Sequence, residues 1–496
     1  MLMLRKMMGC MLGAVMCFSC TREVLDVKVT DEVISSDYIG NGAEWDPYDE
    51  AASWGFDVSE EDWRMLTSRI DVMGMGYVRC MINSRFLYWD AARGGEYIRD
   101  RNIGRLEKVL RYCQDHGITV MYGEFNPPEP HMRDSQEWVK MSVNYLDHLV
   151  NGLGFDCIRH FVIFNEPDGD WASTDGDYGL WMSMARRFDE EMGRYPGLKE
   201  KVSLAAPDVV VHWVHPETGL TADDWIRRTV EDMDELVGIY DVHAYPGQTE
   251  VRDGSYARRL KALREAVPEG KRMILGEAGF KYDKPGDELL LQENLARAEA
   301  HPYAGGADSN MMVYDHFYGL DMALLAMDVM NSGYSGMAVW MLDDAAHSVG
   351  DVGRPDNIKV WGFWNTLGEE VFGCPEEEDV RPWYWAWTLM CRCFPKGCDI
   401  LTVEPCGEES VRMCAAEKDG RQTFAVVNWA EKDRRIRLTM PERFEDASVY
   451  VYEEGRAVYD GKGWLVASDS GLCGEHLVLD VPAGSLVVIT DMNVQD

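Results

Sequence analysis

Short apolar segments alternate with amphipathic segments from residue 38 to about residue 395. The apolar segments, which we predict to be strands, are 38–45, 76–82, 118–125, 160–167, 202–210, 239–246, 272–280 and 336–342. Between them, apolar positions recur at three- and four-residue steps, which is typical of helices packed on one face. The segments 59–73 and 135–151 begin at Ser59 and Ser135, two residues suited to helix N-caps. The pattern therefore predicts repeated strand–helix units.

Eight such units in one stretch predict an α/β fold whose strands are parallel and whose helices form the crossovers. Their number and length match a (β/α)8 TIM barrel over residues 38–395. A doubly wound open sheet is the alternative. It is disfavoured because no G-x-G-x-x-G turn follows the first predicted strand.

The pattern changes after residue 395, where strands recur without helices. Seven β-rich segments separated by Gly, Asp and Lys turns predict a small all-β sandwich domain over residues 396–496. The segment 21–37 contains LDVKVT (25–30), a candidate edge strand of this sandwich. Because no low-complexity linker separates the two domains, we expect them to pack tightly.

The first twenty residues have the features of a secretory signal peptide. Arg5 and Lys6 precede an apolar, Met-rich run that is too short to span a bilayer. Cys20, which ends residues 1–20, resembles the lipidated cysteine of bacterial lipoproteins, although Cys17 and Phe18 depart from the usual residues before it. We therefore expect export and a lipid anchor at a bacterial membrane. Plain cleavage, which gives a periplasmic or secreted protein, and a retained N-terminal anchor are the alternatives.

Charge and cysteine usage narrow the function classes. The chain carries 86 acidic and 49 basic residues, a formal net charge of −37. This field repels polyanions, which argues against nucleic acid and anionic polysaccharide as partners.

Ten of the thirteen cysteines lie beyond the predicted signal peptide, and they lack the paired C-x-x-C spacing of a zinc site. We expect mostly buried thiols and no metal, with one or two disulfides left open.

Two carboxylates stand at the ends of predicted strands. Glu166 ends the fourth, in HFVIFNEP, and Glu277 ends the seventh, in RMILGEAGF. In a closed barrel the carboxyl ends of the strands surround the active-site cleft, and strands four and seven face each other across it. Two carboxyl groups about 5 to 5.5 Å apart are what a retaining glycosidase requires, one as nucleophile and one as acid/base.

These residues resemble those of clan A, a large group of retaining glycoside hydrolases. In that clan an Asn-Glu pair ends strand four and a Glu ends strand seven, as Asn165, Glu166 and Glu277 do here. The resemblance implies that Glu166 is the acid/base, Glu277 the nucleophile, and that no cofactor takes part. The barrel followed by a sandwich is similar in arrangement to the family of glucosylceramidases and β-1,6-glucanases. Glu166 would then have to hold a proton near neutral pH.

The resemblance extends to further positions, each with an alternative structural interpretation. Arg79 would support the nucleophile or form a structural ion pair, and Asn165 would bind the sugar 2-hydroxyl. His243 and Tyr245 stand where the clan places a contact to the nucleophile, although His243 would also suit the core. Trp340 matches the platform beneath the sugar, or it is a core residue. Further expected substrate contacts are Glu124, the main rival carboxylate, and loop tryptophans drawn from Trp45, Trp89, Trp171, Trp213, Trp361 and Trp364.

The sequence thus predicts an exported enzyme that cleaves β-linked oligo- or polysaccharides with retention. Two rivals stay open. One is a non-catalytic surface glycan-binding protein on a barrel scaffold, and the other is a transglycosylase that uses the same two glutamates. We expect the loops at about 281–313 and 345–380 to decide the sugar and the linkage.

Overall fold

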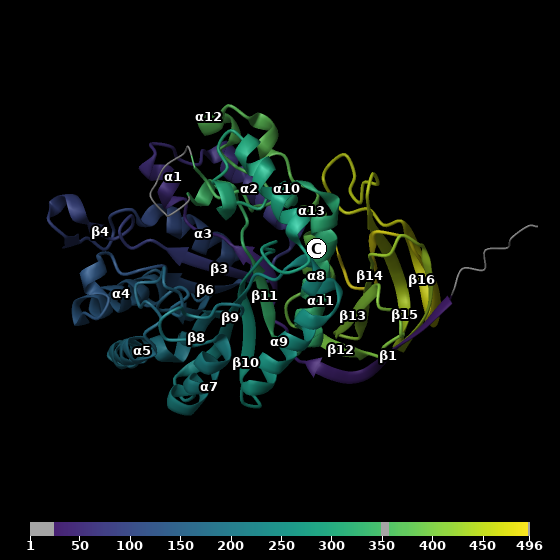
Figure 1. Cartoon of the computed structure of the whole chain (residues 1–496), viewed down its shortest axis with the longest axis horizontal. Helices are drawn as coiled ribbons and strands as arrows, with labels where there is room; N and C mark the ends of the chain where they lie inside the picture. Colours follow the sequence, from purple (N-terminus) through teal and green to yellow (C-terminus); the bar gives the residue numbers. More distant parts are fainter. Residues whose placement is uncertain (1–23, 349–356, 495–496) are drawn as a thin grey trace, which may run out of the picture.

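The computed structural model describes residues 24–348 and 357–494. The predicted signal peptide and Cys20 lie outside the described residues. None of the helices in the described ranges combines the length and the apolar character needed to cross a bilayer. The chain forms two domains, a barrel wrapped by helices and an antiparallel sheet domain beside it (Figure 1).

Eight parallel strands close into a barrel, which confirms the (β/α)8 prediction over the open sheet. The strands are β2 (Gly40–Glu44), β3 (Tyr77–Ile82), β6 (Thr119–Glu124), β7 (Ile158–Val162), β8 (Ser203–Val210), β9 (Val237–Ala244), β10 (Arg272–Ala278) and β11 (Gly336–Val339). Each contains residues of one predicted segment. Apolar side chains such as Met121, Ile239 and Ile274 fill the barrel interior, so it is a packed core and not a pore.

Helices cover the outside of the barrel (Figure 1). The longer ones are α2 (Glu60–Met73), α3 (Ile103–Asp115), α4 (Gln136–Asp147), α5 (Tyr178–Met192), α7 (Ala222–Met233), α9 (Ser255–Ala266), α10 (Glu288–Ala300), α11 (His316–Asn331) and α13 (Trp383–Cys393). Short helices are α1 (Asp49–Ser53), α6 (Leu198–Lys201), α8 (Gln248–Arg252) and α12 (Gly368–Phe372), and β4 (Trp89–Asp90) pairs with β5 (Glu96–Tyr97). Ser59 caps α2 in a capping box with Asp62, as its sequence predicts.

The second domain is an antiparallel β-sandwich to which the N-terminal segment contributes. Its strands are β1 (Val24–Ser35), β12 (Asp399–Val403), β13 (Val411–Lys418), β14 (Arg421–Asn428), β15 (Arg434–Glu453), β16 (Asp469–Val481) and β17 (Ser485–Thr490). Strand β1 pairs with β12 on one side and with β15 on the other, so it is not an edge strand. Strand β15 joins two predicted strands into one because its pairing to β16 continues, with register shifts, past Pro441.

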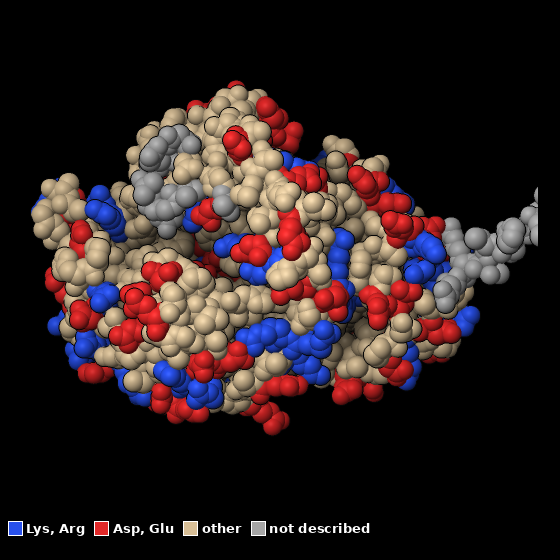
Figure 2. Space-filling view, viewed as in Figure 1, with Lys and Arg blue, Asp and Glu red and all other residues tan. Residues whose placement is uncertain are grey.

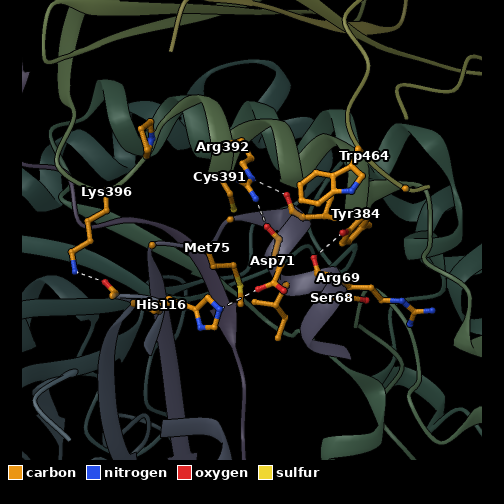
Figure 3. Close-up of a pocket in the computed structure, with 18 of the residues that line it drawn as sticks. Ser68, Arg69, Asp71, Met75, His116, Tyr384, Cys391, Arg392, Lys396 and Trp464 are labelled. Atoms are coloured by element: carbon orange, nitrogen blue, oxygen red, sulfur yellow. Dashed lines mark hydrogen bonds and ion pairs between the residues drawn. The ribbon is translucent and has the colours of Figure 1, made fainter. Parts of the chain in front are cut away.

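Two basic side chains, one from α13 and one from the segment after it, bind main-chain carbonyls at the end of the barrel where the strands begin. Arg392 of α13 donates from Nε to the carbonyl of Val72 at 2.9 Å, and Lys396 donates to the carbonyl of Gly117 at 2.9 Å. These carbonyls end α2 and follow α3, where cations are favoured by the helix dipole. They border a cavity of about 1150 Å³ that Trp464 of the sandwich also lines (Figure 3). This cavity therefore belongs to the domain junction.

The cysteines do not pair. All ten in the described residues are free thiols, and most of them are buried. The disulfides that the sequence left open are therefore not formed among these residues.

Candidate active site

A cavity of about 700 Å³ opens where the barrel strands end. Residues at or after the ends of five different strands line it, among them Phe125, Glu166, Tyr245, Glu277 and Trp340. Active sites of (β/α)8 enzymes occupy this end of the barrel because the loops there converge on one cleft. The cavity therefore contains both predicted catalytic glutamates.

Glu277 enters the cavity because β10 contains a bulge. Ile274 points into the barrel and its neighbours Met273 and Leu275 point outward, so strict alternation would point Glu277 outward as well. The pairing of β10 with β9 shifts register between Leu275 and Glu277, which reverses the alternation. The carboxylate is then buried, with 6% of the residue exposed.

Two donors fix the carboxylate of Glu277. The hydroxyl of Tyr245 donates to Oε1, and Nη1 of Arg79 donates to Oε2 at 3.1 Å. A carboxylate with a charged and a neutral donor on its two oxygens is held in one orientation at the cavity floor. This is the placement required of a group that must approach a substrate from a fixed direction.

Glu166 reaches the cavity from a turn and not from a strand. Strand β7 ends at Val162, earlier than the predicted segment, and Glu166 adopts a left-handed φ of 47°. This conformation is costly for a residue with a side chain. Three bonds hold it: its N–H donates to Asp208 Oδ2 at 3.1 Å, Trp171 Nε1 donates to its Oε2 at 2.7 Å, and His243 Nδ1 lies 2.9 Å from its Oε1.

His243 bridges the carboxylates of the site. Its Nδ1 lies 2.9 Å from Glu166 Oε1 and 3.6 Å from Glu277 Oε2. Its Nε2 lies 3.1 Å from Asp208 Oδ1. Burial lowers the pKa of His243, but the charges of Asp208 and Glu277 outweigh burial and raise that pKa well above its usual value. The imidazole is therefore protonated at neutral pH.

The protonated His243 changes the ionisation expected of Glu166. Burial raises the pKa of Glu166, but the hydrogen bond and the charge of His243 outweigh it and lower this pKa below its usual value. The sequence suggested a proton on Glu166 itself. The lowered pKa of Glu166 and the raised pKa of His243 instead favour the proton on His243, whose Nδ1 lies 2.9 Å from Glu166 Oε1.

Arg79 joins the remaining acidic groups from inside β3. It is fully buried, and its guanidinium donates to Asn165 Oδ1 at 2.7 Å, lies 3.4 Å from Asp208 Oδ2 and also pairs with Glu44. Burial alone would lower the pKa of Arg79, but these carboxylates raise it. Arg79 is therefore part of a buried ion-pair network, and that network includes Glu277.

Sequence reasoning missed Glu44 and Asp208, although both carry the signal that identified the two glutamates. Each is an acidic residue in an otherwise apolar predicted strand, Glu44 in YIGNGAEW and Asp208 in VSLAAPDVV. Asp208 lies at a register shift of β8, in a left-handed conformation with φ 64°. Because a buried carboxylate needs a partner, both positions were readable as members of a buried polar network.

Aromatic side chains form the walls of the cavity. Trp340 directly follows β11 and stacks on His347, with 4.9 Å between ring centroids. Trp171 is 49% exposed and contacts Trp213 edge-on at 4.6 Å, and Trp361 packs against Tyr245 at 5.7 Å. Flat apolar faces of this kind suit pyranose rings.

Two expected substrate contacts, Glu124 and Trp45, do not lie in the cavity. Trp45 is 1% exposed and packs in the outer core against Trp63 and Tyr112, at centroid distances of 5.6 and 5.5 Å. Glu124 points outward from β6, because Met121 points inward and no bulge intervenes. Trp89 and Trp364 do not line the cavity either.

Glu124 is a structural residue whose removal we expect to destabilise the barrel. It accepts hydrogen bonds from Tyr88 Oη at 2.7 Å, Trp138 Nε1 at 3.0 Å and Ser142 Oγ at 2.5 Å, all buried. Glu124→Ala leaves three buried donors without an acceptor and should lower the free energy of unfolding by about 3 kcal/mol or more. Urea denaturation followed by tryptophan fluorescence measures this. A loss below about 1 kcal/mol would show that the donors find other partners.

Three groups of side chains in the described residues come close enough to share a cation. They are Glu44, Asp46 and His347; Glu166, His243 and Glu277; and Asp208, Asp241 and His243. In the second and third groups the charged His243 already lies between the carboxylates at hydrogen-bond distance. The proton on His243 and the guanidinium of Arg79 thus supply positive charge to the cavity floor.

No protein-family model and no curated protein matches this sequence. Solved structures match in fold: a GH30 endoxylanase from Clostridium papyrosolvens aligns with TM-score 0.60 and 13% identity over 94% of this chain and 100% of that chain. A GH39 β-xylosidase from Caulobacter crescentus aligns with TM-score 0.57 and 14% identity over 94% and 99%. A conserved exported protein from Bacteroides fragilis aligns with TM-score 0.61 and 11% identity over 94% and 100%. The chain shares the barrel and sandwich fold of these structures, two of which are glycoside hydrolases.

Proposed function

We propose that this protein is a retaining glycoside hydrolase that uses Glu277 as nucleophile and Glu166 as acid/base. One observation carries the proposal: carboxylate oxygens of Glu166 and Glu277 lie within 4.8 Å of each other, with His243 between them. An upper limit of this size fits the carboxyl groups of retaining enzymes, about 5 to 5.5 Å apart, better than those of inverting enzymes, about 6.5 to 9.5 Å apart.

In the first step Glu277 attacks the anomeric carbon while the leaving oxygen takes a proton from Glu166. Glu166 obtains this proton from His243 Nδ1 at 2.9 Å, which leaves the imidazole neutral. The glycosyl ester on Glu277 removes one negative charge from the floor. Glu166, now a carboxylate, then accepts a proton from the attacking water, and the ester is cleaved.

The cavity supports a β-linked glycan as substrate. Oδ1 of Asn165 accepts from Arg79 at 2.7 Å, which leaves the amide nitrogen as a donor for the sugar 2-hydroxyl. Trp340 offers a platform for the ring, and the neighbours in fold are named as xylanases and xylosidases. Xylosides and glucosides are therefore the first substrates to test.

The experiment is a screen of the purified protein against aryl β-glycosides and β-linked polysaccharides. Proton NMR during hydrolysis of an active substrate reads the configuration of the first product. We expect the β-anomer to appear first. The α-anomer would exclude the retaining mechanism, and binding without any turnover would favour the glycan-binding protein.

The proton shared by His243 and Glu166 predicts how kcat/KM depends on pH. We expect His243→Gln to move the alkaline limb of kcat/KM to lower pH by about 1 unit or more. The wild type loses the essential proton at the raised pKa of His243, whereas the variant loses it at the pKa of Glu166 alone. The pH profile on an aryl glycoside measures the shift.

His160→Gln is a matched control for this change. His160 is a half-buried histidine of β7 whose pKa burial lowers to about 4, and it bonds Ser203 at the start of β8. Its replacement should leave the alkaline limb where it is. An unmoved limb in His243→Gln as well would show that Glu166 stores its own proton.

A further inference from the structure

The walls of the active-site cavity carry basic side chains that the overall composition does not lead one to expect. Apart from the two glutamates, the charged Lys, Arg, Asp and Glu residues that line it are Arg85, Lys281, Asp283, Lys284, Asp308 and Lys359. Counting the two glutamates, the lining has as many basic as acidic residues, four of each, whereas the whole chain has 49 basic and 86 acidic residues. Figure 2 shows acidic and basic side chains interspersed over the visible face, so the net charge of the chain does not describe each part of its surface.

Lys281 is a basic residue of the cavity wall that packs against a side chain of the catalytic site. Its Nζ lies 4.6 Å from the ring centroid of Tyr245, whose hydroxyl binds Glu277. The charge of Lys281 also lowers the pKa of Glu166, in addition to the stronger effect of His243. The ammonium of Lys281 therefore stands beside the sugar that Glu277 would attack.

Lys281 differs from the other lysines of the cavity in having no carboxylate partner. Lys284 pairs with Asp283 at 2.7 Å, and Lys359 lies 3.8 Å from Asp308. Within residues 24–348 and 357–494, no carboxylate forms an ion pair with Lys281. Among the same residues its ammonium lies over the aromatic face of Tyr245, which leaves its three N–H donors available to a ligand.

Each glutamate of the floor already has another cation at hydrogen-bond distance. Arg79 donates to Glu277 at 3.1 Å, and the protonated His243 lies 2.9 Å from Glu166. These cations belong to the floor and are buried, whereas Lys281 is exposed on the wall. An exposed cation on a binding wall, without a partner in the protein, is suited to a partner in the ligand.

We propose that the substrate carries an anionic substituent, a carboxylate or a sulfate, on the sugar bound beside Glu277, and that Lys281 binds it. The inference rests on the proposed function, because it assigns the substrate class of the same cavity. The net charge of −37 disfavours a polyanion. A single acidic group on an otherwise neutral glycan is repelled by the protein far less than a polyanion is. It can still bind the ammonium of Lys281 at close range.

Matched pairs of substrates test this proposal. Aryl β-D-glucuronide and β-D-galacturonide are compared with the corresponding glucoside and galactoside, and 6-sulfated glucoside and galactoside form a second arm. We expect the wild type to prefer the acidic member of at least one pair by about tenfold or more in kcat/KM. The carboxylate and sulfate arms tell the two anions apart.

Variants assign the preference to Lys281. Lys281→Met should lower the acidic-to-neutral ratio by about tenfold, and Lys281→Arg should keep most of it. Lys284→Met, on the same loop, removes a lysine that already has a carboxylate partner and should leave the ratio unchanged. A ratio that Lys281→Met does not alter would overturn the proposal.

The outcomes separate this proposal from the function on which it rests. Turnover of neutral glycosides, with no preference for any acidic member, overturns the substrate class and leaves the hydrolase standing. If no glycoside is cleaved, the hydrolase fails. Calorimetric titration with glucuronate-, galacturonate- and sulfate-bearing disaccharides and their neutral counterparts then decides the binding role of Lys281. Equal affinity for all of them would overturn that role too.

Discussion

Replacing Glu277 with Gln should lower kcat on an active aryl β-glycoside by about 10⁴-fold or more. The amide is too weak a nucleophile to form the glycosyl ester, but its oxygen can accept from Arg79 and its nitrogen can donate to the hydroxyl oxygen of Tyr245. The fold should therefore be retained while the chemistry is lost. Steady-state kinetics, with circular dichroism as the check on folding, measures the effect. A variant with near-normal kcat would exclude Glu277 as the nucleophile.

Glu124→Gln is the matched control for this substitution. Glu124 is also a buried glutamate at the end of a barrel strand, but it points toward α4 and bonds Trp138 and Ser142. Its replacement should reduce stability and leave kcat within about twofold of the wild type. Mass spectrometry after treatment with a slow 2-fluoro glycoside provides an independent test, because the covalent sugar should be found on the peptide that contains Glu277.

The contrast between Glu277 and Glu124 shows what sequence alone could predict. Apolar runs interrupted by amphipathic helices define eight buried parallel strands, since few other arrangements satisfy that pattern. Each strand end is then a candidate position for chemistry. The direction of a side chain depends on alternation along the strand, and the bulge of β10 reverses it at Glu277 whereas β6 has no bulge. No residue pattern in either segment predicts which of the two strands has the bulge.

The electrostatics of the site depend on contacts between strands that are distant in sequence. The closed barrel brings together Asp208 of β8, His243 of β9 and Glu166 of the turn after β7. Hydrogen bonds then connect the three residues. The sequence could name His243 and Glu166 separately. The proton on His243 follows from the third partner, because Asp208 supplies the negative charge that keeps the buried imidazole ionised.

Glu166→Ala should abolish hydrolysis of substrates with poor leaving groups and should be rescued by azide. The variant has no acid for the first step and no base for the second, but an activated aryl glycoside can still form the ester on Glu277 because its leaving group needs no proton. Azide needs no base and is small enough to use the space of the missing side chain. We expect azide to raise kcat of the variant by about 10-fold or more and to give a β-glycosyl azide.

The configuration of that product decides the roles of both glutamates. Azide attacks the ester from the face that Glu166 occupied, so a β-azide means that Glu277 holds the sugar from the opposite face. An α-azide would mean that the side chain removed from position 166 lies on the nucleophile's face of the sugar. The roles of the two glutamates would then be reversed. The same treatment of Glu124→Ala should give neither rescue nor azide product, because Glu124 bonds Tyr88, Trp138 and Ser142 outside the cavity. Rescue there would mean that the barrel presents a third carboxylate to the sugar.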